Sequence, residues 1–221
     1  MKHRLLINEV TTYGKLRCVA GYNFATGGMI RPEPSPGGFW PSYLTGQATA
    51  LYPGNVMDFE GTIPDTEFPH RREDRVVNVG PTIVSRLTTA DFASNLAAIG
   101  STLSKNTFDH FRVSSSGTAY VEAGTDCGSL FGVQLPKGSI SLEEVQTDRG
   151  PRLRCSFELH GSDLCLSVAA TDIRNLHERS GLAAVRNGLN NQTVHLRIGL
   201  ARGWGDFPNR CYMQVNGIYP I

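Results

Sequence analysis

HLRIGLARGWGDFPNRCYMQVNGIY, residues 195–219, is the stretch from which the fold of this chain is inferred. Leu196, Ile198 and Leu200 alternate with polar or small residues, and the same alternation resumes at Cys211 after a loop. Alternation with a period of two is typical of a strand with one buried face. The stretch therefore predicts two antiparallel strands joined by a short loop.

The loop and the polar faces beside it carry the candidate ligand-binding residues of this hairpin. Arginines, aromatic rings and an amide lie close together in sequence, which suits a ligand that is both anionic and flat, such as a nucleotide. The alternative is an ordinary hairpin with a solvated, arginine-rich turn, because surface arginines usually need no function. The candidates are Arg197, Arg202, Trp204, Arg210, Tyr212 and Gln214.

Composition limits the class of protein. The 221 residues are 40% hydrophobic and 19% charged, with a net charge of +1, which is typical of a globular chain. A near-neutral protein lacks the global field of a basic duplex binder, so a nucleic-acid site would be a local patch. We find no signal-peptide pattern or long apolar segment and expect a cytoplasmic protein without membrane contact. The five scattered cysteines are expected to be buried thiols.

The first half of the chain predicts a series of short strands. Three of them form a β-meander signature, and Pro32 places Arg31 at the end of the third. Phe39 and Trp40 follow in a segment rich in Pro and Gly, where they form either a core plug or a stacking platform. The expected strands cover residues 4–10, 17–22, 29–32, 55–63 and 76–85, and a helix over 88–99 follows, with Thr88 and Asp91 as a capping box.

The segment FPHRREDRVV, residues 68–77, concentrates charge of both signs. Its weak catalytic candidates are His70, Glu73 and Asp74, which could act as acid, base or metal ligand. One histidine with a carboxylate falls short of a three-ligand site, so we predict no metal and no cofactor. The alternative is a solvated loop of mixed charge.

The second half repeats the inventory of short strands and one helix. Strands are expected over 140–145, 151–159 and 163–169, followed by a helix from 171 or 172 to about 187. The fold class is mostly β with a few helices, as two small barrels of the OB-like or SH3-like kind, between which the pattern does not decide. We predict a first OB-like barrel with inserted loops and a helix over 1–125, and a second with one helix over 126–221.

Several segments together resemble the dual OB-fold-containing domain family of prokaryotes and phages. They are CVAGYNFATGGMIRP (18–32), PGNVMDFE (53–60), PHRRED (69–74), HLRIGLAR (195–202) and CYMQVNGIYP (211–220). The resemblance implies two OB-like barrels and nucleic-acid or nucleotide binding in bacterial or phage conflict systems, with no established catalytic residue. The family's recurring positions would map to Arg31, Pro32, His70, Glu73, Asp74, Arg197, Gly199, Arg202, Gln214 and Tyr219.

The sequence therefore predicts a module that binds single-stranded nucleic acid or a nucleotide, with Arg31 joining the arginines of the hairpin as a phosphate ligand. The second hypothesis is an enzyme acting on a nucleotide or modified base, with His70 and Glu73 or Asp74 near the arginine cluster. No Walker loop, dinucleotide fingerprint, nucleophile elbow or HExxH helix supports it. The third is a module that docks on a partner protein through Phe39 and Trp40.

Overall fold

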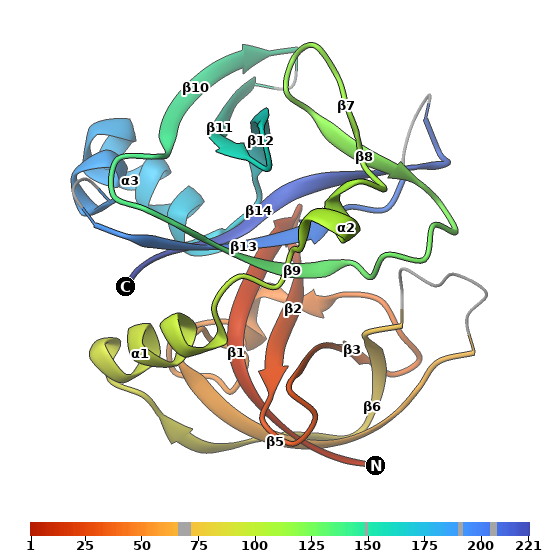
Figure 1. Ribbon diagram of the computed structural model, residues 1–221. Coiled ribbons are helices and arrows are strands. Elements are labelled where there is room, and N and C mark those ends of the chain that lie inside the picture. The colour runs from red at the N-terminus through yellow and green to blue at the C-terminus, as the bar shows by residue number, and fades with distance from the viewer. Residues whose placement is uncertain (66–71, 149, 190–191, 204–206) are drawn as a thin grey trace.

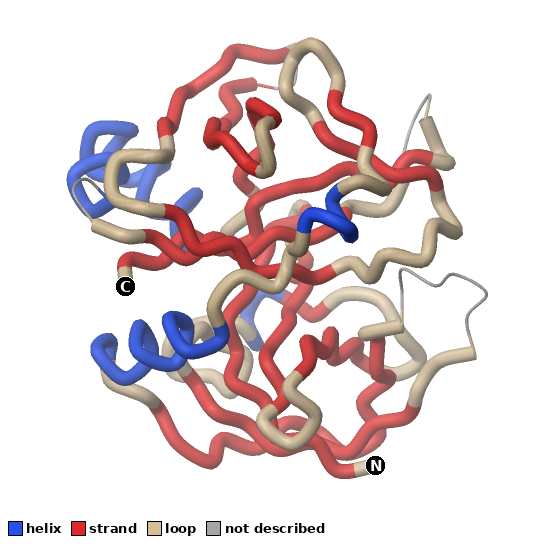
Figure 2. The backbone as a smooth tube through the Cα atoms, viewed as in Figure 1, coloured by secondary structure: helices blue, strands red, loops and turns tan. Residues whose placement is uncertain are grey.

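The structure, a computed structural model, describes residues 1–65, 72–148, 150–189, 192–203 and 207–221. Its strands form two sheets that lie one above the other in Figure 1, and Figure 2 shows that strands dominate both. The helices are few and lie at the periphery of the sheets. The expected fold class, mostly β with a few helices, is confirmed.

The N-terminal sheet is a closed barrel of five strands, in which β1 pairs with both β2 and β5. The consecutive strands β1, β2 and β3 lie side by side, and β5, the fourth strand of the barrel, returns beside β1. β3 and β6 pair in parallel. This is Greek-key order rather than a meander throughout. The strands are β1 (Lys2–Tyr13), β2 (Leu16–Asn23), β3 (Gly28–Pro34), β5 (Asn55–Thr62) and β6 (Asp74–Arg86), and short β4 (Trp40–Pro41) pairs with β2.

The C-terminal sheet repeats this order. β13 (Val194–Leu200) pairs with β9 (Leu130–Leu135), and β10 (Ser141–Thr147) pairs with β11 (Gly150–Leu159). β9 and β10 can be taken as one strand that is interrupted at Pro136 and forms the first strand of this barrel. The fourth strand, β13, then again lies beside the first. The third and fifth strands, β12 (Ser162–Val168) and β14 (Arg210–Pro220), are again parallel. Both halves are therefore OB-like Greek-key barrels.

Additional elements extend the C-terminal barrel. β7 (Arg112–Val113) and β8 (Ala119–Glu122) form a hairpin, and β8 pairs with the first residues of β14. β8 thus precedes the predicted domain border at residue 125 yet belongs to the second sheet, and the border itself stays a prediction. The remaining elements are η1 (Ser42–Leu44), α1 (Thr89–Ile99), α2 (Lys105–Phe108) and α3 (Thr171–Leu189).

The two expected helices are present. The side chain of Thr88 accepts a hydrogen bond from the Asp91 N–H at 3.1 Å, which confirms the N-terminal half of the capping box of α1. α3 differs from the continuous helix we expected, because Gly181 adopts φ 77° and breaks it. A positive φ is accessible to glycine without steric cost, so the sequence could have indicated this break.

The two barrels pack against each other through β1 and β14. The backbone N–H of Thr12 donates to Ala169 O at 3.1 Å, and the Tyr219 hydroxyl donates to Asn8 O at 3.0 Å. Phe92 of α1 packs edge-on against Tyr219, with ring centroids 5.0 Å apart. Each barrel keeps its own apolar core, so the surface between them is where polar residues become buried.

Further expectations concern cysteines and membranes. All five cysteines are free thiols. Cys127, Cys155 and Cys211 are buried as expected, whereas Cys18 and Cys165 are only half-buried. In the part of the chain that the structure describes, no helix is long and apolar enough to span a membrane.

Candidate nucleic-acid interface

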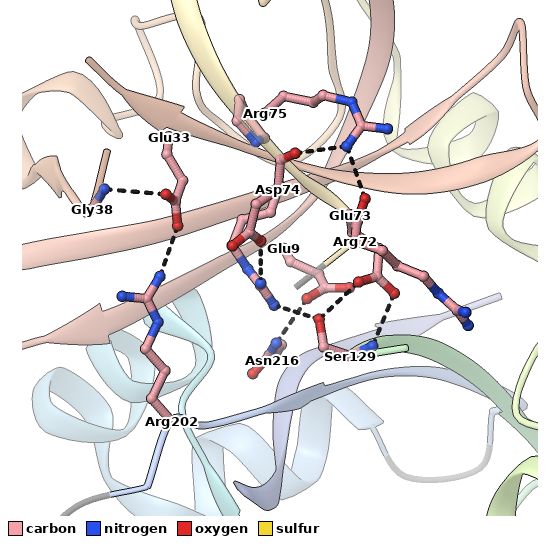
Figure 3. A network of polar contacts seen from close by, with 12 residues as sticks. Glu9, Glu33, Gly38, Arg72, Glu73, Asp74, Arg75, Ser129, Arg202 and Asn216 are labelled. Carbon is pink, nitrogen blue, oxygen red and sulfur yellow. Dashed lines mark hydrogen bonds and ion pairs between the residues drawn. The ribbon is translucent and has the colours of Figure 1, made fainter. Parts of the chain in front are cut away.

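Arg197, expected on the solvent-facing side of β13, lies fully buried between the two barrels. Its Nε donates to Glu9 Oε1 at 3.0 Å, and Nη2 lies 2.8 Å from the same oxygen. Glu9 Oε2 accepts a further hydrogen bond from Asn216 Nδ2 at 2.8 Å (Figure 3). All of β13 is buried, and on the polar face that the alternation predicts, Glu9 of β1 contacts Arg197 and the end of α1 lies against His195. This guanidinium holds the barrels together and is not accessible to a phosphate in this structure.

His195 lies beside this ion pair and is 0% exposed. Burial, with a smaller contribution from the positive charge of Arg197, lowers its pKa to about 4. The imidazole is therefore neutral at pH 7. An added Cβ at Gly132 would lie 2.7 Å from Arg197 Nη1 and 2.9 Å from His195 Nε2, so the absence of a side chain there leaves room for both groups.

Arg31 is the second buried arginine of the junction. Its Nη1 donates to Asp74 Oδ1 at 2.6 Å and its Nη2 to Ser129 Oγ at 3.1 Å. Glu73 accepts from the Ser129 N–H at 2.9 Å and from its hydroxyl at 3.2 Å, as Figure 3 shows. The cluster connects β3 and β6 of the first barrel to the segment before β9 of the second. Two catalytic candidates, Glu73 and Asp74, are thus hydrogen-bonded within a structural contact.

Arg202 also crosses the junction but stays half-exposed. Its Nη2 donates to Glu33 Oε1 at 2.9 Å, and the same carboxylate accepts from the Gly38 N–H at 3.2 Å through its other oxygen (Figure 3). The guanidinium lies over the ring of Phe39, 5.6 Å from its centroid. The side chain of Arg202 is 47% exposed and that of Glu33 only 3%. The outer part of this guanidinium therefore faces solvent.

A second group of candidates, half-buried at the surface, gathers where β8 pairs with the start of β14. Arg210 lies over Tyr120 at 4.7 Å and over Phe207 at 4.4 Å. Tyr120 is opposite Tyr212 in the strand register, with ring centroids 5.5 Å apart. A hydrogen bond with Tyr212 is the main cause that raises the pKa of Arg210, which stays cationic. We call Tyr120, Phe207, Arg210 and Tyr212 the aromatic–arginine cluster.

The strand register places this cluster on a defined face of β14. Arg210, Tyr212, Gln214 and Asn216 alternate with the buried Cys211, Met213 and Val215. Asn216 is covered by the first barrel through Glu9, and Gln214 Nε2 donates to Asn216 Oδ1 at 3.1 Å. The cluster is therefore the open continuation of the face that the first barrel covers. In Figure 1 this part of β14 and β8 lies side by side, away from α3.

The sequence-predicted residues thus fall into two groups. Arg31, Glu73 and Asp74 come together around Ser129, and Arg202 reaches Glu33 on the strand that carries Arg31. Arg210, Tyr212 and Gln214 lie on the exposed continuation of β14. His70 and Trp204 lie outside the described residues, so their roles stay predictions.

The two loops singled out in the sequence have equivalent positions in the two barrels. The segment containing PHRRED connects β5 to β6, and the segment beginning at Arg202 connects β13 to β14. Both are connections between the fourth and fifth strands of an OB-like barrel. Loops at this position are among the ligand-binding loops of OB folds.

Sequence reasoning missed several residues of the junction and the cluster. Glu9 and Asn8 are polar residues inside the apolar run of β1, and that interruption is a signal of a buried polar contact. Tyr120 and Phe207 lie in short segments without periodicity, and no sequence signal indicates that they pack around Arg210. Trp40 is buried and donates to Pro32 O at 2.7 Å, so of the two alternatives for this residue the core plug is confirmed, and Trp40 is not exposed for docking on a partner.

A cavity of about 690 Å³ lies elsewhere on the second barrel, beside the β11–β12 hairpin. Its lining is rich in serine hydroxyls and includes the carboxylates of Glu158 and Asp163, with no lysine or arginine. Two carboxylates without a cation disfavour a phosphate ligand. Within the described part of the chain, no group of three or more His, Cys, Asp or Glu side chains is placed to hold a metal ion.

Comparison with solved structures finds structural similarities. No family model matches the chain, and no curated protein matches it. A solved structure described as "Structure and Conformational Change of a Replication Protein A Heterotrimer Bound to ssDNA" aligns over 98% of this chain with a TM-score of 0.37 and 10% identity. The chain spans about half of that protein's chain, 48%. The class that the strand pairing defines is a protein of two OB-like barrels, and membership of the dual OB-fold family stays a prediction.

Proposed function

We propose that the chain binds single-stranded nucleic acid on the exposed face of β14 and β8. The observation that carries this proposal is the aromatic–arginine cluster, in which a guanidinium lies over two aromatic rings, Tyr120 and Phe207, and Tyr212 packs beside Tyr120 on a half-exposed strand face. Bases stack on aromatic rings and arginine planes, and the guanidinium binds phosphate oxygens. Tyr120 and Tyr212 are half-buried and Phe207 is exposed, so the rings are held in place yet accessible.

A strand suits this surface better than a free nucleotide does. The rings of the cluster lie along an open face, whereas small ligands usually bind in concave sites that bury most of their surface. The cavity on the second barrel lies elsewhere and carries carboxylates. A duplex is disfavoured because the net charge is only +1. A role in a bacterial or phage conflict system remains a prediction of the family resemblance.

The enzyme hypothesis receives no support from the described residues. The carboxylates of Glu73 and Asp74 accept hydrogen bonds from Ser129 and Arg31, and both lie at the junction of the barrels. A general base must be within hydrogen-bond reach of a substrate proton, and these groups are engaged with the protein itself.

Fluorescence anisotropy with labelled dT12 at low salt tests the proposal, with ATP as a competitor. Loss of one stacking ring costs about 1–3 kcal/mol per base, so Tyr212→Ala is expected to weaken binding by at least about 5-fold. Phe24→Ala is the matched control, because Phe24 is 46% exposed in the turn between β2 and β3 of the first barrel. Equal binding by both variants and the wild type would contradict the proposed face. Displacement of dT12 by equimolar ATP would indicate a nucleotide site.

A further inference from the structure

A second aromatic pair lies on the first barrel, next to Arg202. Tyr13, at the end of β1, stacks on Phe39 with ring centroids 5.1 Å apart and an interplanar angle of 16°. Tyr13 is 67% exposed, and Phe39 is half-buried. Arg202 covers Phe39, and its guanidinium centre lies 5.6 Å from the ring centroid. The pair is therefore a stacked platform in which the Tyr13 ring is open to solvent and Phe39 lies against both Tyr13 and the cation of Arg202.

Arg202 connects this pair to the aromatic–arginine cluster of the second barrel. The residue before it, Ala201, donates its N–H to Tyr212 O at 2.8 Å, so Arg202 leaves the sheet beside Tyr212. Its side chain then reaches across to Glu33 and Phe39 on the first barrel. One arginine thus stands between two groups of rings, one on each barrel.

The charge of Arg202 is only partly compensated at this position. Glu33 engages Nη2 with one carboxylate oxygen, while the other oxygen accepts from the Gly38 N–H at 3.2 Å. A guanidinium has five N–H donors in a planar fork, so donors remain on the half-exposed side of Arg202. Glu33 fixes the direction of the arginine, and the outer edge is suited to a phosphate.

Building on the proposed function, we propose that a single strand crosses the junction between the barrels. Bases stack on Tyr120 and Tyr212 of the second barrel and on Phe39 and Tyr13 of the first, and Arg202 binds the phosphate that spans the two. The substrate is then a strand long enough to reach both pairs, rather than a short oligomer held by one barrel. OB folds occupy about 4–16 nucleotides each.

A length series of labelled dT oligomers tests this path. Phe39→Ala is expected to weaken binding of dT12 by about 5-fold or more while leaving binding of dT4 unchanged, because about 1 kcal/mol or more is lost per stacked base. Tyr13→Ala should act in the same direction, and since Tyr13 is 67% exposed its loss leaves the core intact. Phe24→Ala is again the control, and a thermal melt confirms that each variant is folded.

The outcomes separate this inference from the function on which it rests. If Tyr212→Ala weakens dT12 binding while Phe39→Ala and Tyr13→Ala do not, the path across the junction is wrong and the proposed face on the second barrel stands. If Phe39→Ala weakens the binding of dT4 and dT12 equally, a short oligomer already binds at the first barrel. The proposal that only a longer strand crosses the junction is then overturned. If the wild-type protein binds neither oligomer at low salt, both proposals fail.

Discussion

The buried arginines of the junction and the exposed arginines near the loop after β13 look alike in sequence but differ in their surroundings. Arg197 and Arg31 are 0% and 8% exposed and are held by carboxylates, while Arg202 and Arg210 face solvent beside aromatic rings. Arg31 and Arg197 lie within β3 and β13, Arg210 begins β14, and Arg202 lies shortly after β13. The difference comes from the first barrel, which covers one part of the β13–β14 face and leaves the other open. For Arg197 and Arg210, which lie on these two strands, the role is thus decided by which part of that face they occupy.

Removal of the buried guanidinium should have the largest effect on stability. Arg197→Ala leaves the Glu9 carboxylate buried with only Asn216 as a hydrogen-bond donor. Breaking a buried ion pair from one side typically costs about 3–5 kcal/mol, and we expect a loss of unfolding free energy in that range. Urea denaturation followed by circular dichroism measures it. The double variant Glu9→Leu/Arg197→Met removes both charges and should be more stable than the single variant; equal losses would contradict an ion-pair origin.

The protein should lose stability when the pH is lowered, because His195 is buried in its neutral form. Its folded pKa of about 4 lies below the ordinary value of 6.5, so the unfolded chain binds the proton more readily. Stability from this group is fully present above pH 6.5 and is lost as the pH falls toward 4, by at most about 3 kcal/mol. Urea midpoints of the wild type and His195→Gln between pH 4.5 and 7.5 measure this. The wild type should lose more stability than the variant on acidification, and parallel curves would exclude His195 as the cause.

Gly132 tests how tightly the buried group is packed. A Cβ at this position would meet Arg197 Nη1 at 2.7 Å and Gly100 O at 3.0 Å, and the backbone oxygen cannot move like the end of a flexible side chain. Gly132→Ala is expected to destabilise the protein by about 1–3 kcal/mol, as overpacking does. Gly188→Ala in α3 is the control, because nothing lies within 4 Å of its added Cβ. A thermal melt in which both variants match the wild type would show that the junction is loosely packed.

Arg210, outside the buried junction, should affect ligand binding more than stability. Arg210→Ala removes a half-buried guanidinium that lies over Tyr120 and Phe207, and it is expected to lower stability by no more than about 2 kcal/mol, less than the loss expected for Arg197→Ala. Its effect should appear in binding, because loss of one phosphate contact lowers the slope of log K against log salt by about 0.7 for a single strand. Salt titrations of dT12 binding by wild type and variant measure it. An unchanged slope would remove Arg210 from the proposed phosphate contacts.

Much of the fold follows from local patterns in the chain. The alternation in the terminal hairpin, the capping box at Thr88 and the strand patterns over 151–159 and 163–169 each predict an element that the structure contains. The choice between OB-like and SH3-like barrels depends on the parallel pairs β3–β6 and β12–β14. These contacts join segments far apart in sequence, and periodicity within a strand carries no information about which strand lies beside it.

The candidate site was predictable only in its residue types. Arg202, Arg210, Tyr212 and Gln214 lie where a ligand has access, but Arg31 and Arg197 are buried because of partners that come from distant strands. Alternation assigns a side chain to the outer face of its own sheet. Whether another barrel covers that face depends on tertiary packing. Glu9 is the partner of Arg197 because the fold places β1 beside it, and the two residues are 188 positions apart in sequence.

The contact between Glu9 and Arg197 can form only late in synthesis of the chain. The two residues are separated by 188 positions, so during synthesis the carboxylate emerges long before its partner. At roughly 5–20 residues per second the interval is about 10–40 seconds. During it, a first barrel that has already folded would present an ionised, hydrated group on the surface that will later be enclosed. A charge on a growing sheet opposes premature pairing with other nascent chains, and its neutralisation would come only with the last strands to emerge.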